Sequence, residues 1–150
     1  MAPDRVACHA ACVGVGAAGV LIRGPPGSGK SSLALLLADA LGAALVADDR
    51  VLVEALRGRL VARPHLSVAG LVEVRGQGIL SAADLGVAVL SETTLALAVD
   101  LMDEAARLPE PPTDLDLLGV ALPRLVLDRG ARAAGLAPML IRARLRQVLA

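Results

Sequence analysis

The sequence predicts a single α/β domain, spanning residues 1–150, with a mixed, strand-rich sheet and few helices. Three observations favour this class. The 150 residues are 55% hydrophobic and 20% charged, which suits one domain with a buried core and excludes a disordered chain. A short apolar run leads into a glycine-rich turn and then into apolar residues at helical spacing. Further short apolar runs, separated by turn residues, indicate additional strands.

The first third of the chain predicts strands around one helix. The segment between Arg5 and Arg23 is expected to form strand, turn and strand, ending in the apolar run 20–22. Apolar residues at helical spacing over 33–41 predict a helix that stops at Gly42. Residues 44–47 predict a second buried strand. This strand–helix–strand unit favours a parallel sheet with a right-handed crossover.

The remainder of the chain is predicted to be mostly strand. Residues 51–56 and 60–62 indicate a hairpin around the turn 57–59, and further strands are expected at 71–74, 87–90, 95–101 and 125–127. Pro109, Pro111 and Pro112 predict a surface loop. A C-terminal helix is expected from Ala133 to Leu149, with Pro138 either in its first turn or interrupting it.

Composition excludes several function classes. The 15 basic and 15 acidic residues cancel, and the chain has no aromatic residue, so we expect no nucleic-acid partner. The longest uncharged run, between Arg5 and Arg23, contains glycines and is short for a spanning helix, so we expect no membrane partner. Nothing at the start resembles a targeting segment. Cys8 and Cys12 are expected to be small core residues in a reducing, cytoplasmic setting.

The strongest motif is GPPGSGKS at 24–31, a full match to the phosphate-binding loop pattern between a predicted strand and a predicted helix. Glycines there let backbone N–H groups converge on phosphate oxygens, and the start of the helix adds its positive dipole end. In this pattern the lysine reaches the β and γ phosphates and the following serine holds Mg²⁺. The nucleotide-binding residues are therefore expected to be Gly24, Gly27, Ser28, Gly29, Lys30, Ser31 and Ser32.

Acidic residues follow the second predicted strand. Asp48 and Asp49 are expected at the same sheet edge as the phosphate-binding loop, where one acid supports the metal shell and the other accepts a proton from an attacking hydroxyl. The alternative is a solvated turn in which Arg50 pairs with either acid. Glu73 and Arg75 are expected on one side of a short strand, which suggests a polar cleft. An edge-strand ion pair explains the same pattern equally well.

The phosphate-binding loop, VADDR at 46–50 and EVRGQGI at 73–79, in this order and spacing, resemble the C-terminal catalytic domain of the bacterial HPr kinase/phosphorylase family. The resemblance runs from about residue 6 to residue 145. It implies a P-loop fold related to phosphoenolpyruvate carboxykinase, and transfer of phosphate from ATP, with Mg²⁺, to a serine of the phosphocarrier protein HPr. It also implies removal of that phosphate by phosphorolysis. Members of the family form hexamers through this domain, so the resemblance further implies a homo-oligomer, a hexamer by family analogy.

The resemblance also implies roles for single residues. Asp49 matches the carboxylate that deprotonates the target serine, and Asp48 is its neighbour in the motif. Lys30 matches the phosphate-binding lysine, and the magnesium ligands would be Ser31 and Glu73. Further catalytic residues implied are His9, Arg75 and Arg107, and Arg129 and Arg132 fall in the loop associated with dephosphorylation.

Departures from the family and two alternatives remain open at this point. The chain looks like a short form without the N-terminal domain, and the proline usual near Arg129 is missing. One alternative is a small-molecule kinase with the same nucleotide-binding loop, which would not need the 73–79 signature. The other is a non-catalytic nucleotide-sensing module, which would bind ATP without transfer.

Overall fold

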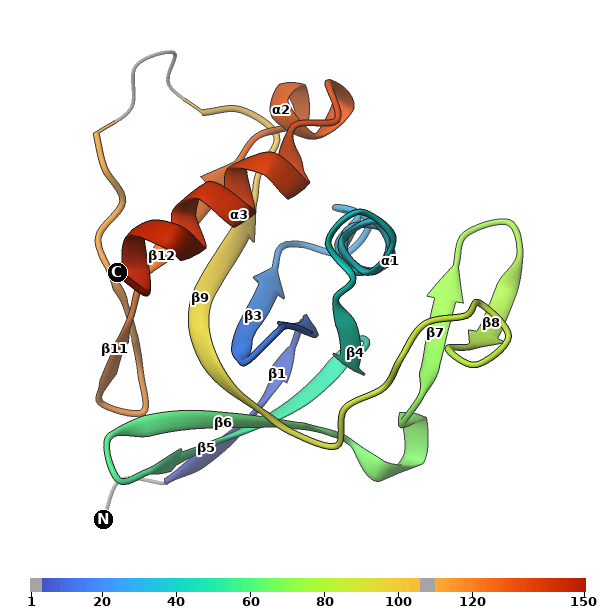
Figure 1. Cartoon of the computed structure of the whole chain (residues 1–150), viewed down its shortest axis with the longest axis horizontal. Coiled ribbons are helices and arrows are strands. Elements are labelled where there is room, and N and C mark those ends of the chain that lie inside the picture. The colour runs from blue at the N-terminus through green and yellow to red at the C-terminus, as the bar shows by residue number, and fades with distance from the viewer. Residues whose placement is uncertain (1–3, 106–109) are drawn as a thin grey trace.

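The computed structural model describes residues 4–105 and 110–150 (Figure 1). The helical segments are α1 (Lys30–Leu41), a single 3₁₀ turn (Leu66–Val68), α2 (Arg129–Ala133) and α3 (Ala137–Val148). The strands are β1 (Arg5–His9), β2 (Ala11–Val15), β3 (Ala18–Arg23), β4 (Ala44–Ala47), β5 (Arg50–Leu56), β6 (Arg59–Pro64), β7 (Leu71–Val74), β8 (Gly78–Ser81), β9 (Thr93–Leu101), β10 (Leu115–Leu117), β11 (Val120–Leu122) and β12 (Arg124–Leu127).

One large mixed sheet dominates the fold. Its strand order is β1-β5-β6-β9-β3-β2-β4, and β12 pairs with β9 off this path. The pairs β3–β9 and β9–β12 are parallel, whereas the other pairs of this sheet are antiparallel. The hairpins β7–β8 and β10–β11 form separate two-stranded sheets. The predicted mixed, strand-rich sheet with few helices is confirmed.

The parallel pairing expected from the strand–helix–strand unit is wrong. β3 and β4 run in the same direction, but β2 lies between them and pairs antiparallel with both. The cause is local: the chain turns sharply at Gly16, whose φ is +60°, and β2 pairs at once with β3. The crossover through α1 therefore returns β4 one strand further out.

Two other expected elements differ from the structure. Residues 87–90 do not form a strand, and only a bridge between Val89 and Leu45 remains there. The expected helix 133–149 is two helices, because Gly135 (φ +76°) ends the first of them. Pro138 lies in the first turn of α3, as one of the two expectations had it. The loop at Pro111 and Pro112 is confirmed, and Pro109 lies outside the described residues.

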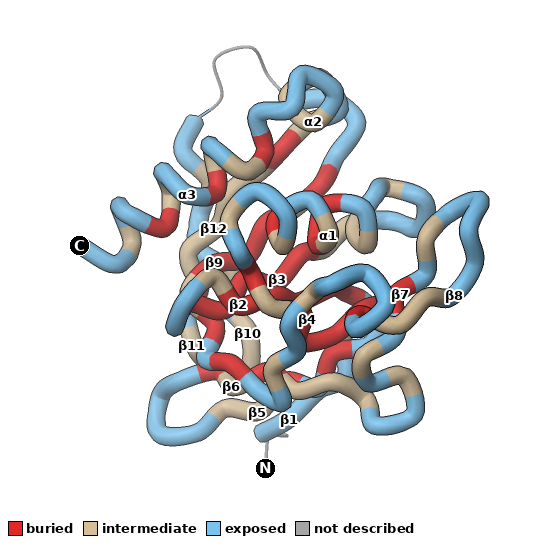
Figure 2. Tube along the Cα trace, turned by 45° about the vertical axis from the view of Figure 1, so that its right-hand side comes forward, coloured by how far each residue is buried: buried red, intermediate tan, exposed pale blue. Residues whose placement is uncertain are grey.

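The core lies on both faces of the main sheet (Figure 2). On one face Val20, Ile22 and Val99 pack against α1 and α3 through Leu37 and Ile141. On the other face the curled strands β5 and β6 and the hairpin β10–β11 cover a second cluster, which contains Cys12 and is lined by Cys8. Both cysteines are free thiols; Cys12 is a core residue, as expected, whereas Cys8 is only partly buried against that core. Among the described residues no helix is long and apolar enough to cross a membrane.

Candidate phosphoryl-transfer site

The phosphate-binding loop connects the end of β3 to the start of α1, as predicted. Gly27 and Gly29 have φ values of +76° and +96°, a region that side chains with a β carbon rarely adopt. Gly29 caps α1 without a side-chain hydrogen bond, so the first backbone N–H groups of the helix are available to an anion. A β carbon at Gly24 would lie 2.5 Å from Ser28 Oγ, so the loop closes only around glycine at this position.

Lys30 folds back over its own loop. Its Nζ donates to the carbonyl oxygens of Gly24 at 2.7 Å and Pro25 at 3.3 Å. These bonds hold the ammonium group beside the glycine-rich turn, where a bound phosphate would take over as its partner. Ser28 Oγ is buried and makes no hydrogen bond within the described residues.

Asp48 joins three elements at the edge of the site. Asp48 is only 5% exposed. Oδ1 accepts the hydroxyl of Ser31 at 2.6 Å, and Oδ2 accepts the backbone N–H of Glu73 at 3.1 Å. The carboxylate therefore fastens the start of α1 and strand β7 to the end of β4.

Asp49 sits on a strained backbone and, unlike Asp48, is exposed. Its φ is +68°, and the N–H of Arg50 donates to the carbonyl of Asp48 at 2.8 Å, which closes a three-residue turn of the strained kind. The N–H of Ala10 donates to the Asp49 carbonyl at 3.2 Å. The consequence is that two adjacent acids separate, with Asp48 buried and Asp49 exposed at the pocket. Strain of this kind is typical of functional sites.

These groups surround one pocket of about 380 Å³. Residues 26–32 line it on one side, and the rest of its lining is Asp49, Glu73 and Arg75. The structure thus brings together Lys30, Ser31 and three predicted residues from two other segments. Carboxylate and hydroxyl oxygens are the ligands that Mg²⁺ prefers, and Ser31 and Glu73 both line this pocket, so this pair fits that ion.

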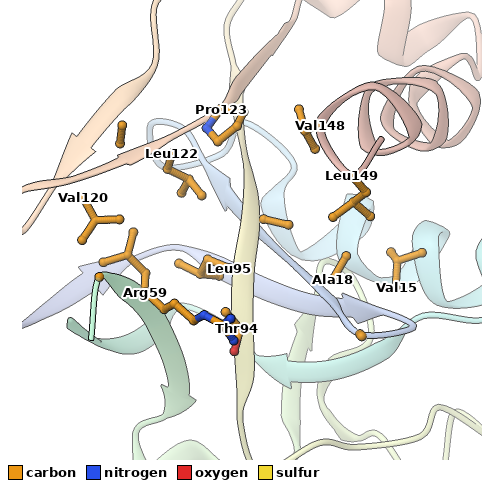
Figure 3. Close-up of a pocket in the computed structure, with 15 residues that line it drawn as sticks. Val15, Ala18, Arg59, Thr94, Leu95, Val120, Leu122, Pro123, Val148 and Leu149 are labelled. Carbon is orange, nitrogen blue, oxygen red and sulfur yellow. The ribbon is translucent and has the colours of Figure 1, made fainter. Parts of the chain in front are cut away.

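A larger hollow of about 630 Å³ lies elsewhere. Figure 3 shows it beside β9, between Leu122 and Leu149. Ala18 at the start of β3 lines it, whereas the phosphate-binding loop follows the end of the same strand. Apart from Arg59 and Thr94 its lining is apolar, and none of the predicted site residues belongs to it.

Besides Gly24 and Asp48, the predicted residues His9, Arg129 and Arg132 fall outside the pocket lining. His9 is exposed at the end of β1, directly opposite Arg50, the residue after Asp49. Arg129 Nη2 lies 3.0 Å from Asp103 Oδ1. Arg132 Nη1 donates to the carbonyls of Leu127 at 2.6 Å and Met102 at 2.9 Å. The catalytic role expected of Arg107 falls on a residue outside the described part of the chain.

A charged cluster that the sequence analysis missed lies beside the loop. Asp100, on β9, accepts hydrogen bonds from Arg23 Nε at 2.7 Å and from Arg23 Nη2 at 2.8 Å. Arg124 Nη2 lies 2.7 Å from Asp100 Oδ2. Burial raises the pKa of Asp100, but the hydrogen bonds from Arg23 and then Arg124 outweigh it and hold the pKa below its ordinary value. Arg23 directly precedes Gly24, and Asp100 follows an apolar run. These two positions were the only features of the sequence that could have indicated the cluster.

Comparison with known proteins agrees with this architecture. A phosphate-binding loop that connects β3 to the start of α1, with two acids directly after β4, is the arrangement of a P-loop α/β domain. Residues 1–136 match the family model described as the HPr Serine kinase C-terminal domain. The chain belongs to this family.

Individual relatives are HPr kinase/phosphorylases. The HPr kinase/phosphorylase of Streptococcus thermophilus is 37% identical over 130 residues, which cover 81% of this chain and 42% of that protein. The HPr kinase/phosphorylase of Clostridium tetani is 40% identical over 77 residues, covering 51% of this chain and 25% of that protein. The chain thus spans well under half the length of these curated relatives.

A solved structure confirms the fold. The Hpr(Ser) kinase/phosphatase from Coxiella burnetii superposes with a TM-score of 0.84 at 24% sequence identity, covering 97% of this chain and 99% of that one. The predicted family and its α/β class are therefore confirmed, whereas the roles of the single site residues stay predictions.

Proposed function

We propose that this chain is an ATP- and magnesium-dependent protein serine kinase that phosphorylates an HPr-type phosphocarrier protein. The observation that carries the proposal is the position of Asp49. An exposed carboxylate on a strained turn shares one pocket with the phosphate-binding loop, Lys30 and Glu73. Family membership and the names of the relatives support the substrate class.

In the proposed complex the loop's N–H groups and Lys30 hold the phosphates of ATP. Ser31 and Glu73 would hold Mg²⁺, with Asp48 fixing both through its two hydrogen bonds; the ion supplies neutralisation of phosphate charge. Arg75, also in the pocket lining, would stabilise negative charge on the transferred group.

The chemistry assigned to Asp49 is proton transfer. Its carboxylate accepts the proton of the target serine while the serine oxygen forms a bond to the γ phosphorus. The bond from that phosphorus to the β–γ bridging oxygen breaks, and ADP leaves. Catalysis of this kind depends mainly on positioning and charge stabilisation. In the reverse reaction inorganic phosphate attacks phosphoserine, pyrophosphate forms, and protonated Asp49 returns the proton to the serine oxygen.

The test is a transfer assay with the purified chain, ATP, Mg²⁺ and an HPr-type phosphocarrier protein. We expect mass spectrometry to show one phosphoryl group on a serine of the carrier, and addition of inorganic phosphate to remove it if the reverse reaction operates. Asp49→Asn is expected to abolish transfer and to retain ATP binding. Full activity of that variant would refute the assignment of Asp49.

The same assay separates the alternatives. A small-molecule kinase would leave the carrier unmodified while forming ADP with a metabolite. A nucleotide sensor would bind ATP saturably and transfer nothing. We also propose that the enzyme is cytoplasmic and that it forms a homo-oligomer. Light scattering on the purified chain measures the oligomeric state directly.

A further inference from the structure

The hairpin β7–β8 has one packed face and one open face. Val72 is 1% exposed and packs with Leu45 of the main sheet. Side chains alternate along a strand, so Leu71 and Glu73 lie on the opposite face. Leu71 is 38% exposed. Figure 1 shows the hairpin at the right of the molecule, beyond α1 and β4.

Ile79 lies directly opposite Glu73 on this open face. The N–H of Glu73 donates to Asp48 and not across to β8. Glu73 and Ile79 therefore form a non-hydrogen-bonded pair, in which the two Cα atoms lie about 4.5 Å apart and the side chains are close. Glu73 lines the phosphoryl-transfer pocket, so Ile79 lies next to a lining residue, although it is not itself part of the lining.

Ile79 is 71% exposed, and it lies directly across the hairpin from Glu73, a residue of the pocket lining. Apart from Pro26 and the glycines, the side chains that line this pocket carry charged or hydroxyl groups. An exposed isoleucine gains free energy only when a second apolar surface excludes water from it.

We infer that Ile79 is a specificity-determining contact for the protein substrate, and that it receives an apolar side chain next to the serine that is phosphorylated. The inference rests on the proposed function. The target hydroxyl must enter the pocket that Asp49 and Glu73 line, and Ile79 is exposed directly across the hairpin from Glu73. Ile79 thus selects a serine with an apolar neighbour over a serine in a polar surface.

The test uses two variants of the same shape. Ile79→Val and Ile79→Thr both keep a β-branched side chain, and they differ by a methyl against a hydroxyl group. Burial of one methylene is worth about fourfold in affinity, so we expect Ile79→Val to raise the KM for the carrier protein by at most about fourfold. We expect Ile79→Thr to raise it about tenfold, because it also places a hydroxyl against the apolar partner.

Two controls make the outcome specific. The Kd for ATP is expected to stay unchanged in both variants. Leu66→Thr replaces an 89% exposed side chain in the turn before β7, outside the pocket lining, and is expected to leave the carrier KM unchanged. Circular dichroism and the thermal midpoint verify that all three variants fold.

Each contrary result has a distinct meaning. An unchanged carrier KM in Ile79→Thr, or an equal rise in Leu66→Thr, would overturn the inference while transfer by the wild-type chain upholds the proposed function. A raised Kd for ATP in Ile79→Thr would place Ile79 against the nucleotide and also overturn it. Absence of transfer by the wild-type chain would instead overturn the proposed function itself.

Discussion

Replacing Asp48 with alanine removes the carboxylate that holds β7 against α1. The backbone N–H of Glu73 loses its partner, and the hydroxyl of Ser31 loses a bond of 2.6 Å. Hydrogen bonds to a charged group contribute about 1.5–3 kcal/mol each. Removing a carboxylate that is only 5% exposed offsets part of this loss, because its desolvation cost disappears as well. We therefore expect a net destabilisation of about 2–3 kcal/mol.

The isosteric variant Asp48→Asn provides the matched control. Its side-chain oxygen still accepts the Glu73 N–H, and its amide group donates to Ser31 Oγ, whose hydroxyl reorients. We expect a loss below about 1 kcal/mol, because both groups keep a partner. Urea unfolding measures the two free energies of unfolding. Hydrogen exchange of residues 71–81 reports whether the hairpin detaches locally.

The reasoning fails under one clear result. If Asp48→Ala unfolds at the same urea concentration as the wild-type protein, and if exchange at 71–81 is unchanged, the carboxylate does not hold the hairpin. Fast exchange at 71–81 with little change in global stability would instead show that the hairpin opens alone. That outcome keeps the contact and revises only the coupling between the hairpin and the core.

Three further predictions follow from single groups. Asp49→Gly is expected to raise the free energy of unfolding by about 1 kcal/mol in urea unfolding, because φ +68° suits glycine, and to abolish transfer; lower stability would contradict the strain. Lys30→Ala is expected to weaken ATP binding about a hundredfold by calorimetry, since a charge-assisted contact with the phosphates is lost; unchanged affinity would count against the loop assignment. Asp100 has a folded-state pKa below 3.8, so its stabilisation is present above about pH 4 and is lost as the pH falls through the folded pKa. Asp100→Asn should therefore flatten the acid limb of the stability curve, and an unaltered limb would show that the two arginines contribute nothing there.

Local patterns in the sequence were sufficient for much of the fold. The helix that ends at Gly42 and the hairpin around residues 57–58 depend on neighbouring residues, and both are present where expected. Which strands lie next to each other in the sheet was harder to predict from the sequence. The insertion of β2 between β3 and β4 follows from pairing with both, and a periodicity argument applied to 20–47 alone does not contain that information.

In the site, too, contiguous motifs were predictable from the sequence and contacts between distant residues were not. The loop at 24–31 and the acids at 48–49 were recognisable because each motif is contiguous. The assignment of Glu73 to the site came from the family resemblance, since a short strand with alternating charge suggests only a cleft, and its hydrogen bond to Asp48 is seen only in the structure. The ion pair between Arg23 and Asp100 joins residues 77 positions apart. Neither residue is distinctive alone, so only the parallel pairing of β3 with β9 reveals the contact.

The turn at Asp49 explains why two adjacent acids serve one site. On a regular extended strand, neighbouring side chains point to opposite faces of the sheet, and one of the two carboxylates would leave the sheet edge. A positive φ at Asp49, closed by the bond from Arg50 to the Asp48 carbonyl, bends the chain between β4 and β5. The bend lets Asp48 remain buried against Ser31 while Asp49 reaches the same pocket from the exposed side. Glycine at this position would relieve the strain and keep the buried Asp48, but it would remove the exposed carboxylate to which we assign proton transfer.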